Sequence, residues 1–173
     1  MARIPYVEKD GAPPEVAETF AKMEARGNYV GNLWKMIAHS SSALIHVIRT
    51  GNALLTKTRI DPKLREMAIL RTAELLGCAY EIRPHTKAAI QEGMTDEQLK
   101  AIKDWESSNS FSDIERAVLC FTDEVAQVAK VKDETFSNLA KYLDEGMMAE
   151  LALIVGFYGM LARTLLPFEV DLD

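Results

Sequence analysis

Four side chains that could carry out acid–base or thiol chemistry lie close together in the sequence: Glu66, Cys78, Glu81 and His85. A histidine changes its charge near neutral pH, a buried carboxyl group can keep a proton there, and a thiolate is a strong nucleophile. Elsewhere the charged residues are dispersed, as on a solvated surface. The sequence therefore predicts one small site for proton transfer or thiol chemistry.

The last three of these residues are spaced i, i+3 and i+7, which places them on one face of a continuous helix. Glu81 precedes His85 by four residues, so its carboxylate could hydrogen-bond to the imidazole and fix its tautomer. Pro84 cannot donate a backbone hydrogen bond, so we expect it in the first turn of a helix over residues 84–92. Cys78 would then lie just before a helix N-terminus, where the helix dipole favours a thiolate.

Each of these residues also has a simpler structural explanation. Cys78 follows Gly77 between apolar segments and could be a packing residue, whereas Glu81 and His85 could form a surface pair. Glu66 could be a solvated glutamate. The remaining residues of these types are expected to have structural roles: His39, His46 and Cys120.

The elements that must position the site are predicted to be helices, about eight of them. Alternation of β-branched residues is nearly absent, and prolines and glycines fall mostly between segments of helical periodicity. Helix starts are marked by Asp61-Pro62, Thr95-x-x-Gln98 and Ser112-x-x-Glu115. The expected helical ranges are 15–25, 31–42, 43–55, 62–76, 84–92, 96–107, 113–129, 133–143 and 145–165.

A weak internal repeat relates two of these helices. Residues 64–75 (LREMAILRTAEL) resemble residues 114–125 (IERAVLCFTDEV), and the turn EGMTDE recurs as EGMMAE fifty-three residues later. The repeat predicts two helical hairpins of one design packed against each other. The second copy has no cysteine or histidine at the corresponding site positions, so helix packing alone does not require them.

The composition predicts one soluble domain over residues 1–173. Hydrophobic residues make up 48% and charged residues 27% of the chain. The net charge of −6 disfavours nucleic acid and anionic membranes as partners. The most apolar run, residues 147–166, is interrupted by charged residues and glycines, so we expect a buried helix there. No signal-peptide pattern is present in the sequence, which favours a cytoplasmic protein.

Several other kinds of site are disfavoured by spacing. The two cysteines form no disulfide framework, and no Cys-x-x-Cys or His-x-x-x-His pair supports a metal site. No nucleophile elbow or phosphate-binding loop is present. We therefore expect neither a metal nor a cofactor.

Residues 64–102 resemble the core of carboxymuconolactone decarboxylase-family proteins, relatives of alkylhydroperoxidase D. That family has a glutamate on one helix, then Cys-x-x-Cys or a variant, then x-x-x-His, and a Gly-Met-Thr-like turn before the next helix. Glu66, Cys78, His85 and the GMTDEQ segment match in register. The resemblance covers about residues 33–166, preceded by an N-terminal extension (1–32). It implies an alkylhydroperoxidase D-like all-α fold and a homo-oligomer, trimer or hexamer, with the site near a subunit boundary.

The chain departs from the thiol branch of this family at one position, where Glu81 replaces the second redox cysteine. Cys78 therefore has no nearby resolving thiol. The resemblance then favours cofactor-free decarboxylase or lyase chemistry on a small carboxylated molecule. His85 would transfer the proton and Glu81 would orient it, with Glu66 as a second carboxyl group and Cys78 lining the site.

The resemblance and composition also suggest a substrate-binding set. Arg71 or Arg83 could hold a substrate carboxylate, while Trp34 and Tyr80 could line the pocket. Two other functions stay open: a thiol-dependent alkylhydroperoxidase or peroxiredoxin-type antioxidant that uses Cys78, and a non-catalytic oligomeric protein that binds small molecules.

Overall fold

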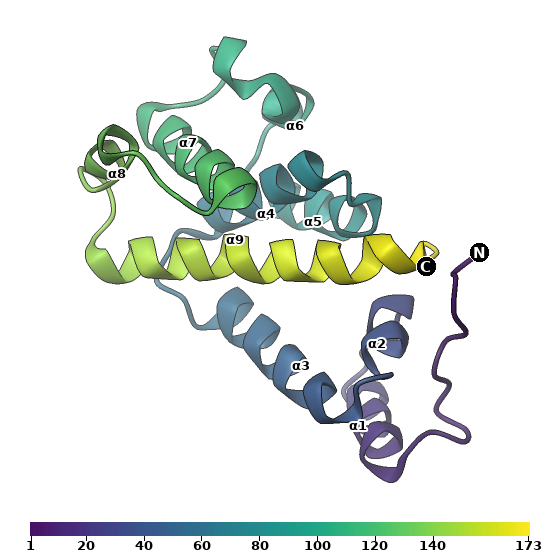
Figure 1. Ribbon diagram of the computed structural model, residues 1–173. Helices are drawn as coiled ribbons and strands as arrows, with labels where there is room; N and C mark the ends of the chain where they lie inside the picture. The colour runs from purple at the N-terminus through teal and green to yellow at the C-terminus, as the bar shows by residue number, and fades with distance from the viewer. The chain divides into compact units, whose positions relative to one another are not determined.

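The computed structural model describes all residues, 1–173, and contains helices but no strand, so the predicted all-α class is confirmed (Figure 1). The chain forms two compact units: Met1–Thr56 with Arg163–Asp173, and Lys57–Ala162. The helices are α1 (Pro14–Ala25), α2 (Asn32–Ile37), α3 (Ser41–Thr56), α4 (Pro62–Leu76), α5 (Ala79–Gln91), α6 (Asp96–Ala101), η1 (Ile102–Ser107), α7 (Asp113–Val128), α8 (Asp133–Leu139), α9 (Glu145–Leu165) and η2 (Leu166–Phe168). The predicted division into an extension (1–32) and a family core (33–166) remains a prediction.

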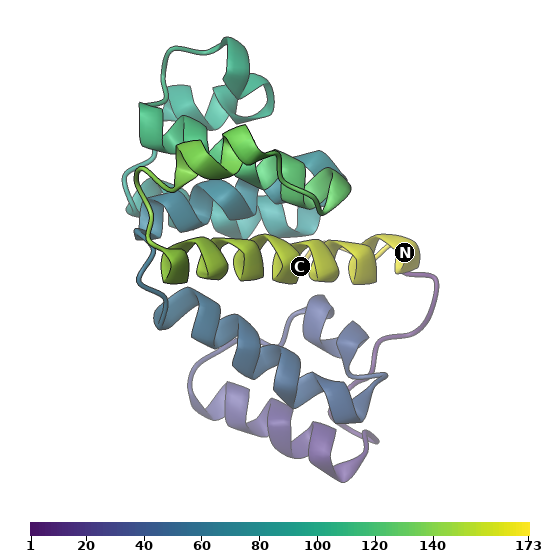
Figure 2. The ribbon, with the colours of Figure 1, turned by 60° about the vertical axis from the view of Figure 1, so that its left-hand side comes forward.

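The predicted repeat of helical hairpins is present in the second unit. Helix α4 packs against α5, α7 packs against α8, and α4 also packs against α7 (Figure 2). The equivalent threonines have the same contact. Thr72 Oγ1 donates to the carbonyl of Ala68 at 2.7 Å, and Thr122 Oγ1 donates to that of Val118 at 2.8 Å. The two similar sequences therefore form two helices, α4 and α7, that pack against each other.

The second predicted part of the repeat, the Glu-Gly-Met turn, is not structurally equivalent in its two copies. Gly93 follows α5 with a positive φ of 92°, as at many helix C-termini. Gly146 instead lies in the first turn of α9, just after Asp144, which accepts a hydrogen bond from the Met147 N–H. The same three letters end one helix and begin another, so this expectation was wrong.

The start of α5 differs from the predicted one. Asp61 caps α4 as expected, and Gly77 ends α4 in the left-handed region with a φ of 68°. The next helix begins at once, with Cys78 as its N-cap, so Pro84 lies in the helix interior rather than in its first turn. The expected position of Cys78 before a helix N-terminus is confirmed, although the position expected for Pro84 was wrong.

The two predicted capping boxes are present. The Gln98 N–H donates to Thr95 Oγ1 at 3.2 Å, and the Ser112 N–H donates to Glu115 at 2.8 Å. The helix predicted over residues 96–107 is broken, however. Asp104 has non-helical φ and ψ angles, and residues 102–107 form the separate helix η1.

Arg71 holds η1 to the two central helices of the second unit. Its guanidinium donates to both carboxylate oxygens of Asp123 on α7, at 2.5 and 2.9 Å, and to the carbonyls of Ile102 and Lys103. Trp105 Nε1 donates to the same Asp123 carboxylate at 3.0 Å. Ile102 and Trp105 belong to a buried apolar cluster, whose members are Met67, Leu70, Ala89, Met94, Ile102, Trp105, Phe111 and Leu119.

The first unit contains α1, α2 and α3, and both α1 and α2 pack against α3. The break between α2 and α3 falls at residues 38–40, a few residues earlier than predicted. His39 lies in this break, where its Nε2 is 2.8 Å from the carbonyl oxygen of Pro5. The chain ends are held together by Tyr6, whose hydroxyl donates to Asp171 at 3.1 Å.

Helix α9 contains the most apolar segment of the chain. By length and composition Glu145–Phe168 could cross a membrane, and half of its most apolar window is buried inside the protein. Buried side chains of this helix include Leu151, Ile154 and Tyr158. These buried side chains agree in part with the buried helix predicted from the charges and glycines that interrupt the run.

Candidate active site

Helices α4 and α5 bring together the four residues that the sequence singles out. Glu66 lies on α4, Cys78 is the N-cap of α5, and Glu81 and His85 follow on α5. The first three are almost fully buried, with exposed fractions of 2%, 1% and 4%, and the His85 side chain is 12% exposed. Two carboxyl groups, one imidazole and one thiol therefore share a largely dehydrated region of the second unit.

His85 is paired with Glu66 rather than with Glu81. The Nδ1 atom of His85 lies 2.7 Å from Oε2 of Glu66, a hydrogen bond between consecutive helices. Because the carboxylate accepts, Nδ1 carries a proton. In the neutral form of the imidazole, Nε2 is then the proton acceptor. Arg65 Nε donates to the other oxygen of Glu66 at 3.2 Å and so stabilises its negative charge.

Glu81 faces the opposite nitrogen of His85 at a longer distance. Its Oε2 lies 3.6 Å from His85 Nε2, beyond a hydrogen bond but within the range of an ion pair. The predicted hydrogen bond is therefore not formed, and an orienting role of Glu81 remains a prediction. The other oxygen, Oε1, is buried and has no hydrogen-bond partner. Burial raises the pKa of Glu81, and the nearby His85 only partly offsets this shift. Glu81 is therefore suited to hold a proton above the pH at which a solvated glutamate releases it.

Cys78 has the expected position but not the expected ionisation. The backbone N–H groups of Glu81 and Tyr80 interact with its sulfur and lower the thiol pKa, as predicted for a helix N-terminus. Burial has the larger effect, and together with the Glu81 charge it raises the pKa of Cys78 overall. The thiolate predicted at this position is therefore disfavoured. The other cysteine, Cys120, is half-buried on α7, and both cysteines are free.

Tyr158 of α9 completes the surroundings of His85. The two rings meet edge to face, with centroids 4.8 Å apart and an interplanar angle of 87°. Burial raises the pKa of Tyr158, and the charges of Glu81 and Glu66 raise it further. Tyr158 therefore remains a neutral phenol that packs against the imidazole and limits its orientations.

Arg71 is not placed to anchor a substrate. Its guanidinium is held by Asp123 and two backbone carbonyls, and the residue is buried. The substrate-binding role predicted for Arg71 is therefore replaced by a structural one. A donor group already saturated by protein partners cannot also hold a ligand without breaking those contacts.

The other predicted substrate-binding residues fall in two places. Tyr80, half-buried, and Arg83, exposed, lie in the first turns of α5, on the same helix as Glu81 and His85. Trp34 belongs to the first unit, where it lines a hollow with residues of α1 and α3. A role of Tyr80 or Arg83 in binding a substrate therefore remains a prediction.

Two contributors to the site were missed by sequence reasoning. Arg65 stands next to Glu66 in the sequence, and its side chain is only 11% exposed and pairs with that carboxylate. Tyr158 lies in an otherwise apolar run, where a phenol is unusual and could have indicated a specific contact. Neither helical spacing nor motif matching relates α9 to α5, because that contact is formed only in the folded chain.

The arrangement can transfer protons. A neutral imidazole offers Nε2 as a base, and a carboxyl group with a raised pKa faces it as an acid, both shielded from water. Such a pair can take a proton from one atom of a bound molecule and return one to another.

Comparisons with known proteins bear on the family and the fold of this chain. The carboxymuconolactone decarboxylase family model matches residues 43–124 of the chain. The uncharacterized protein YdfG of Bacillus subtilis (strain 168) is 26% identical over 101 residues, which cover 57% of this chain and 69% of that protein. The uncharacterized protein YnjA of Escherichia coli (strain K12) is 24% identical over 108 residues, 62% of this chain and 59% of that one.

Solved structures share the fold at low sequence identity. A peroxidase-related protein of Ralstonia eutropha JMP134 with an alkylhydroperoxidase AhpD core has a TM-score of 0.84 and 18% identity, covering 99% of this chain and 92% of that one. A cysteine-to-alanine variant of the debrominase Bmp8, in complex with 2,3,4-tribromopyrrole, has a TM-score of 0.81 and 18% identity. The match covers 100% of this chain and 94% of that one. These similarities establish the fold and leave the reaction open.

Proposed function

Because the chain belongs to the carboxymuconolactone decarboxylase family of AhpD-like helical proteins, we propose that it is a cofactor-free acid–base enzyme of the lyase type. Its substrate would be a small carboxylated molecule. The observation that carries this proposal is the pairing of His85 with Glu66 at 2.7 Å, which leaves Nε2 of His85 facing the carboxyl group of Glu81, whose Oε1 has no hydrogen-bond partner.

The proposed reaction needs only proton transfer by the protein. Loss of CO2 from a substrate carboxylate leaves the bonding electron pair on carbon, where an adjacent carbonyl or double bond delocalises it. The neutral carboxyl group of Glu81 then donates its proton to that carbon, and solvent returns a proton to Glu81. His85 Nε2 orients the substrate or exchanges a proton with it, while Glu66 and Arg65 hold the imidazole in one tautomer.

Thiol chemistry is the second candidate, because Cys78 stands at the N-cap of α5, within reach of the N–H groups of Tyr80 and Glu81. Two proteins of the same fold are a peroxidase-related protein and a debrominase. Burial of Cys78 and the raised pKa of its thiol argue against this candidate. A peroxidase cycle would also need a second thiol, supplied from outside the site.

Substrate turnover separates the two functions. Purified protein would be offered carboxymuconolactone and related unsaturated or keto-lactone carboxylates, with released CO2 measured directly. A second assay would follow hydroperoxide consumption in the presence of a dithiol. We expect CO2 release that His85→Ala lowers by about 10²–10⁴-fold, the usual contribution of a positioned acid or base. We also expect only a small effect from Cys78→Ser.

The matched control is His46→Ala, since His46 is an exposed histidine on α3 in the first unit. Hydroperoxide consumption that Cys78→Ser abolishes and Cys120→Ser does not would instead establish the thiol function. Specific binding of one of these acids without turnover would favour the non-catalytic binding protein.

We also propose a homo-oligomer, a trimer or hexamer, in the cytoplasm. Support comes from the family resemblance and from exposed apolar residues on α9, Leu153 and Met160, which are 62% and 42% exposed. Light scattering coupled to size-exclusion chromatography would measure the subunit number. A monomer at micromolar concentration would contradict this part of the proposal.

A further inference from the structure

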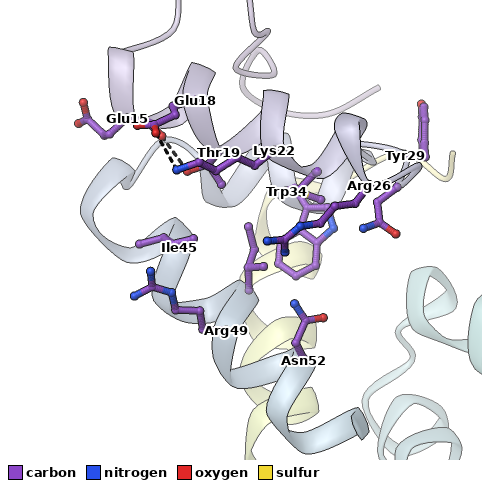
Figure 3. A pocket seen from close by; sticks show the side chains of 13 residues that line it. Glu15, Glu18, Thr19, Lys22, Arg26, Tyr29, Trp34, Ile45, Arg49 and Asn52 are labelled. Atoms are coloured by element: carbon purple, nitrogen blue, oxygen red, sulfur yellow. Dashed lines mark hydrogen bonds and ion pairs between the residues drawn. The ribbon is translucent and has the colours of Figure 1, made fainter.

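A hollow in the first unit lies between α1 and α3, and none of its lining residues takes part in the proposed reaction. Its cavity volume is about 650 Å³, within the range of small-molecule sites. Figure 3 shows the side chains of Lys22 on α1, of Arg26 just after the end of α1, and of Arg49 and Asn52 on α3, together with Trp34 of α2. The apolar part of the lining consists of Met23, Trp34, Ile45 and Ile48.

The charges around this hollow are unevenly neutralised. Glu18 forms an ion pair with Lys22, with Oε1 and Nζ 2.6 Å apart (Figure 3). The carboxylate of Glu15 accepts hydrogen bonds from its own N–H and from the Ser41 hydroxyl, which lowers its pKa. Both acidic groups of the lining are therefore satisfied by groups of the protein.

The two arginines of the lining have no such partner. Arg3, Arg59, Arg65 and Arg71, by contrast, each form an ion pair with a carboxylate. Arg26 and Arg49 are exposed at the rim and make no ion pair. In a chain with a net charge of −6, two guanidinium groups that line the same hollow without carboxylate partners make it locally positive.

A neighbouring hollow in the same unit shows the contrast. It has a volume of about 430 Å³, and its lining includes Lys9 and Lys35. Both lysines are neutralised, by Glu24 at 2.5 Å and by Glu8 at 2.8 Å. Lysines beside the smaller hollow are thus paired with carboxylates. Arg26 and Arg49, which have no such partner, line the larger hollow together with its apolar residues.

We propose that the hollow between α1 and α3 binds a small organic acid with a flat apolar body. The guanidinium groups of Arg26 and Arg49 hold its carboxylate, since arginine binds carboxylates with two parallel hydrogen bonds. Trp34, Ile45 and Ile48 cover the apolar body. The site is separate from the proposed reaction, because none of its residues belongs to α4, α5 or α9.

The test uses a charged probe and its neutral isostere, 2-naphthoate and 2-naphthamide, with the full chain. Binding is followed through the two tryptophan indole N–H signals in a ¹H–¹⁵N spectrum of labelled protein, assigned with a Trp34→Phe variant. We expect saturable movement of the Trp34 signal with 2-naphthoate and much weaker binding of the amide. The Trp105 signal is an internal reference, because that indole is buried in the second unit and bonded to Asp123.

The double variant Arg26→Gln/Arg49→Gln should weaken 2-naphthoate binding by about tenfold or more and leave the amide unaffected, because only the charge-assisted bonds are lost. Both arginines are exposed, so the fold should persist, and the spectrum itself verifies this. The control Lys130→Gln removes an exposed cation of the second unit and should change nothing.

His85→Ala separates this site from the proposed active site. The proposal is overturned if the arginine double variant binds 2-naphthoate as the wild type does, or if the Trp34 signal does not move. It is also overturned if His85→Ala abolishes the binding, because the acid would then occupy the region of α4 and α5. CO2 release plays no part in these outcomes, so failure of the proposed reaction would leave them interpretable.

Discussion

Oε2 of Glu66 and Nδ1 of His85 lie 2.7 Å apart although 19 positions separate the two residues in the chain. The contact joins α4 to α5 across their packed faces, and Arg65 supports it from the α4 side. A carboxylate on Nδ1 fixes which ring nitrogen remains available for chemistry. This single contact determines the direction in which His85 can transfer a proton.

Removing the Glu66 carboxylate should change the tautomer of His85. In the wild type we expect the Nδ1–H form, visible in the ¹⁵N shifts of the imidazole. In Glu66→Gln we expect a mixture, because an amide can either accept or donate. Turnover should fall by about 10²-fold or more as the correct form is lost. Glu134→Gln, an exposed change on α8, is the matched control. An unchanged His85 tautomer in Glu66→Gln would contradict the inferred geometry.

Glu81 should make stability depend on pH in a predictable direction. The pKa of Glu81 is raised by burial above its ordinary value of 4.5, so the folded protein keeps this proton longer than the unfolded chain does. Below pH 4.5, Glu81 carries its proton in both the folded and the unfolded state, so Glu81→Gln should have little effect on stability. As the pH rises above 4.5, the wild type loses stability relative to the variant.

The measurement is the difference in melting temperature between Glu81→Gln and wild type, taken from acid to mildly alkaline pH. The melting temperature of Glu81→Gln should rise relative to that of the wild type as the pH rises. The melting temperature of Glu134→Gln should not show this rise relative to the wild type. A difference that stays constant with pH would mean that Glu81 ionises alike in both states.

Cys78 should react slowly with alkylating agents at neutral pH. Its side chain is 1% exposed, and its thiol pKa is raised above the ordinary value of 9.0. Reaction with iodoacetamide in a Cys120→Ser variant, followed by mass spectrometry, should therefore accelerate only as the pH is raised well above neutrality. Rapid modification of Cys78 at pH 7 would restore the thiolate expected from the helix N-terminus and favour the antioxidant function.

Arg71 should matter for stability and not for substrate binding. Arg71→Met leaves the carboxylate of Asp123 beside a buried tryptophan without its cation, which should cost about 3 kcal/mol of unfolding free energy. The double variant Arg71→Met/Asp123→Leu should recover part of this loss, since both charges are then absent. Denaturant unfolding provides the values. Arg83→Met is the comparison, with a loss below about 1 kcal/mol expected for an exposed side chain.

Local signals in the sequence predicted where most helices begin. Asp61-Pro62, Thr95-x-x-Gln98 and Ser112-x-x-Glu115 are capping patterns that act within one turn, so their effect can be read from neighbouring residues. The all-α class and the repeat of α4 in α7 followed from periodicity in the same way. The position predicted for Pro84 from local signals was wrong. Pro84 lies inside α5, where it has no N–H group to donate the usual backbone hydrogen bond. Packing against α4 offsets that loss, and packing is not a local property.

The sequence by itself determined which reagents the candidate site contains: Glu66, Cys78, Glu81 and His85 were singled out by residue type and spacing. Only the tertiary structure decided their pairing. Spacing of i, i+4 suggested Glu81 as the partner of His85, whereas packing of α4 on α5 gives that contact to Glu66 and leaves Glu81 without a bond at Oε1. Burial likewise decided that the Cys78 thiol keeps its proton despite the helix N-terminus. Distances between helices and exclusion of water arise only when the chain folds, and they set the chemistry available to these residues.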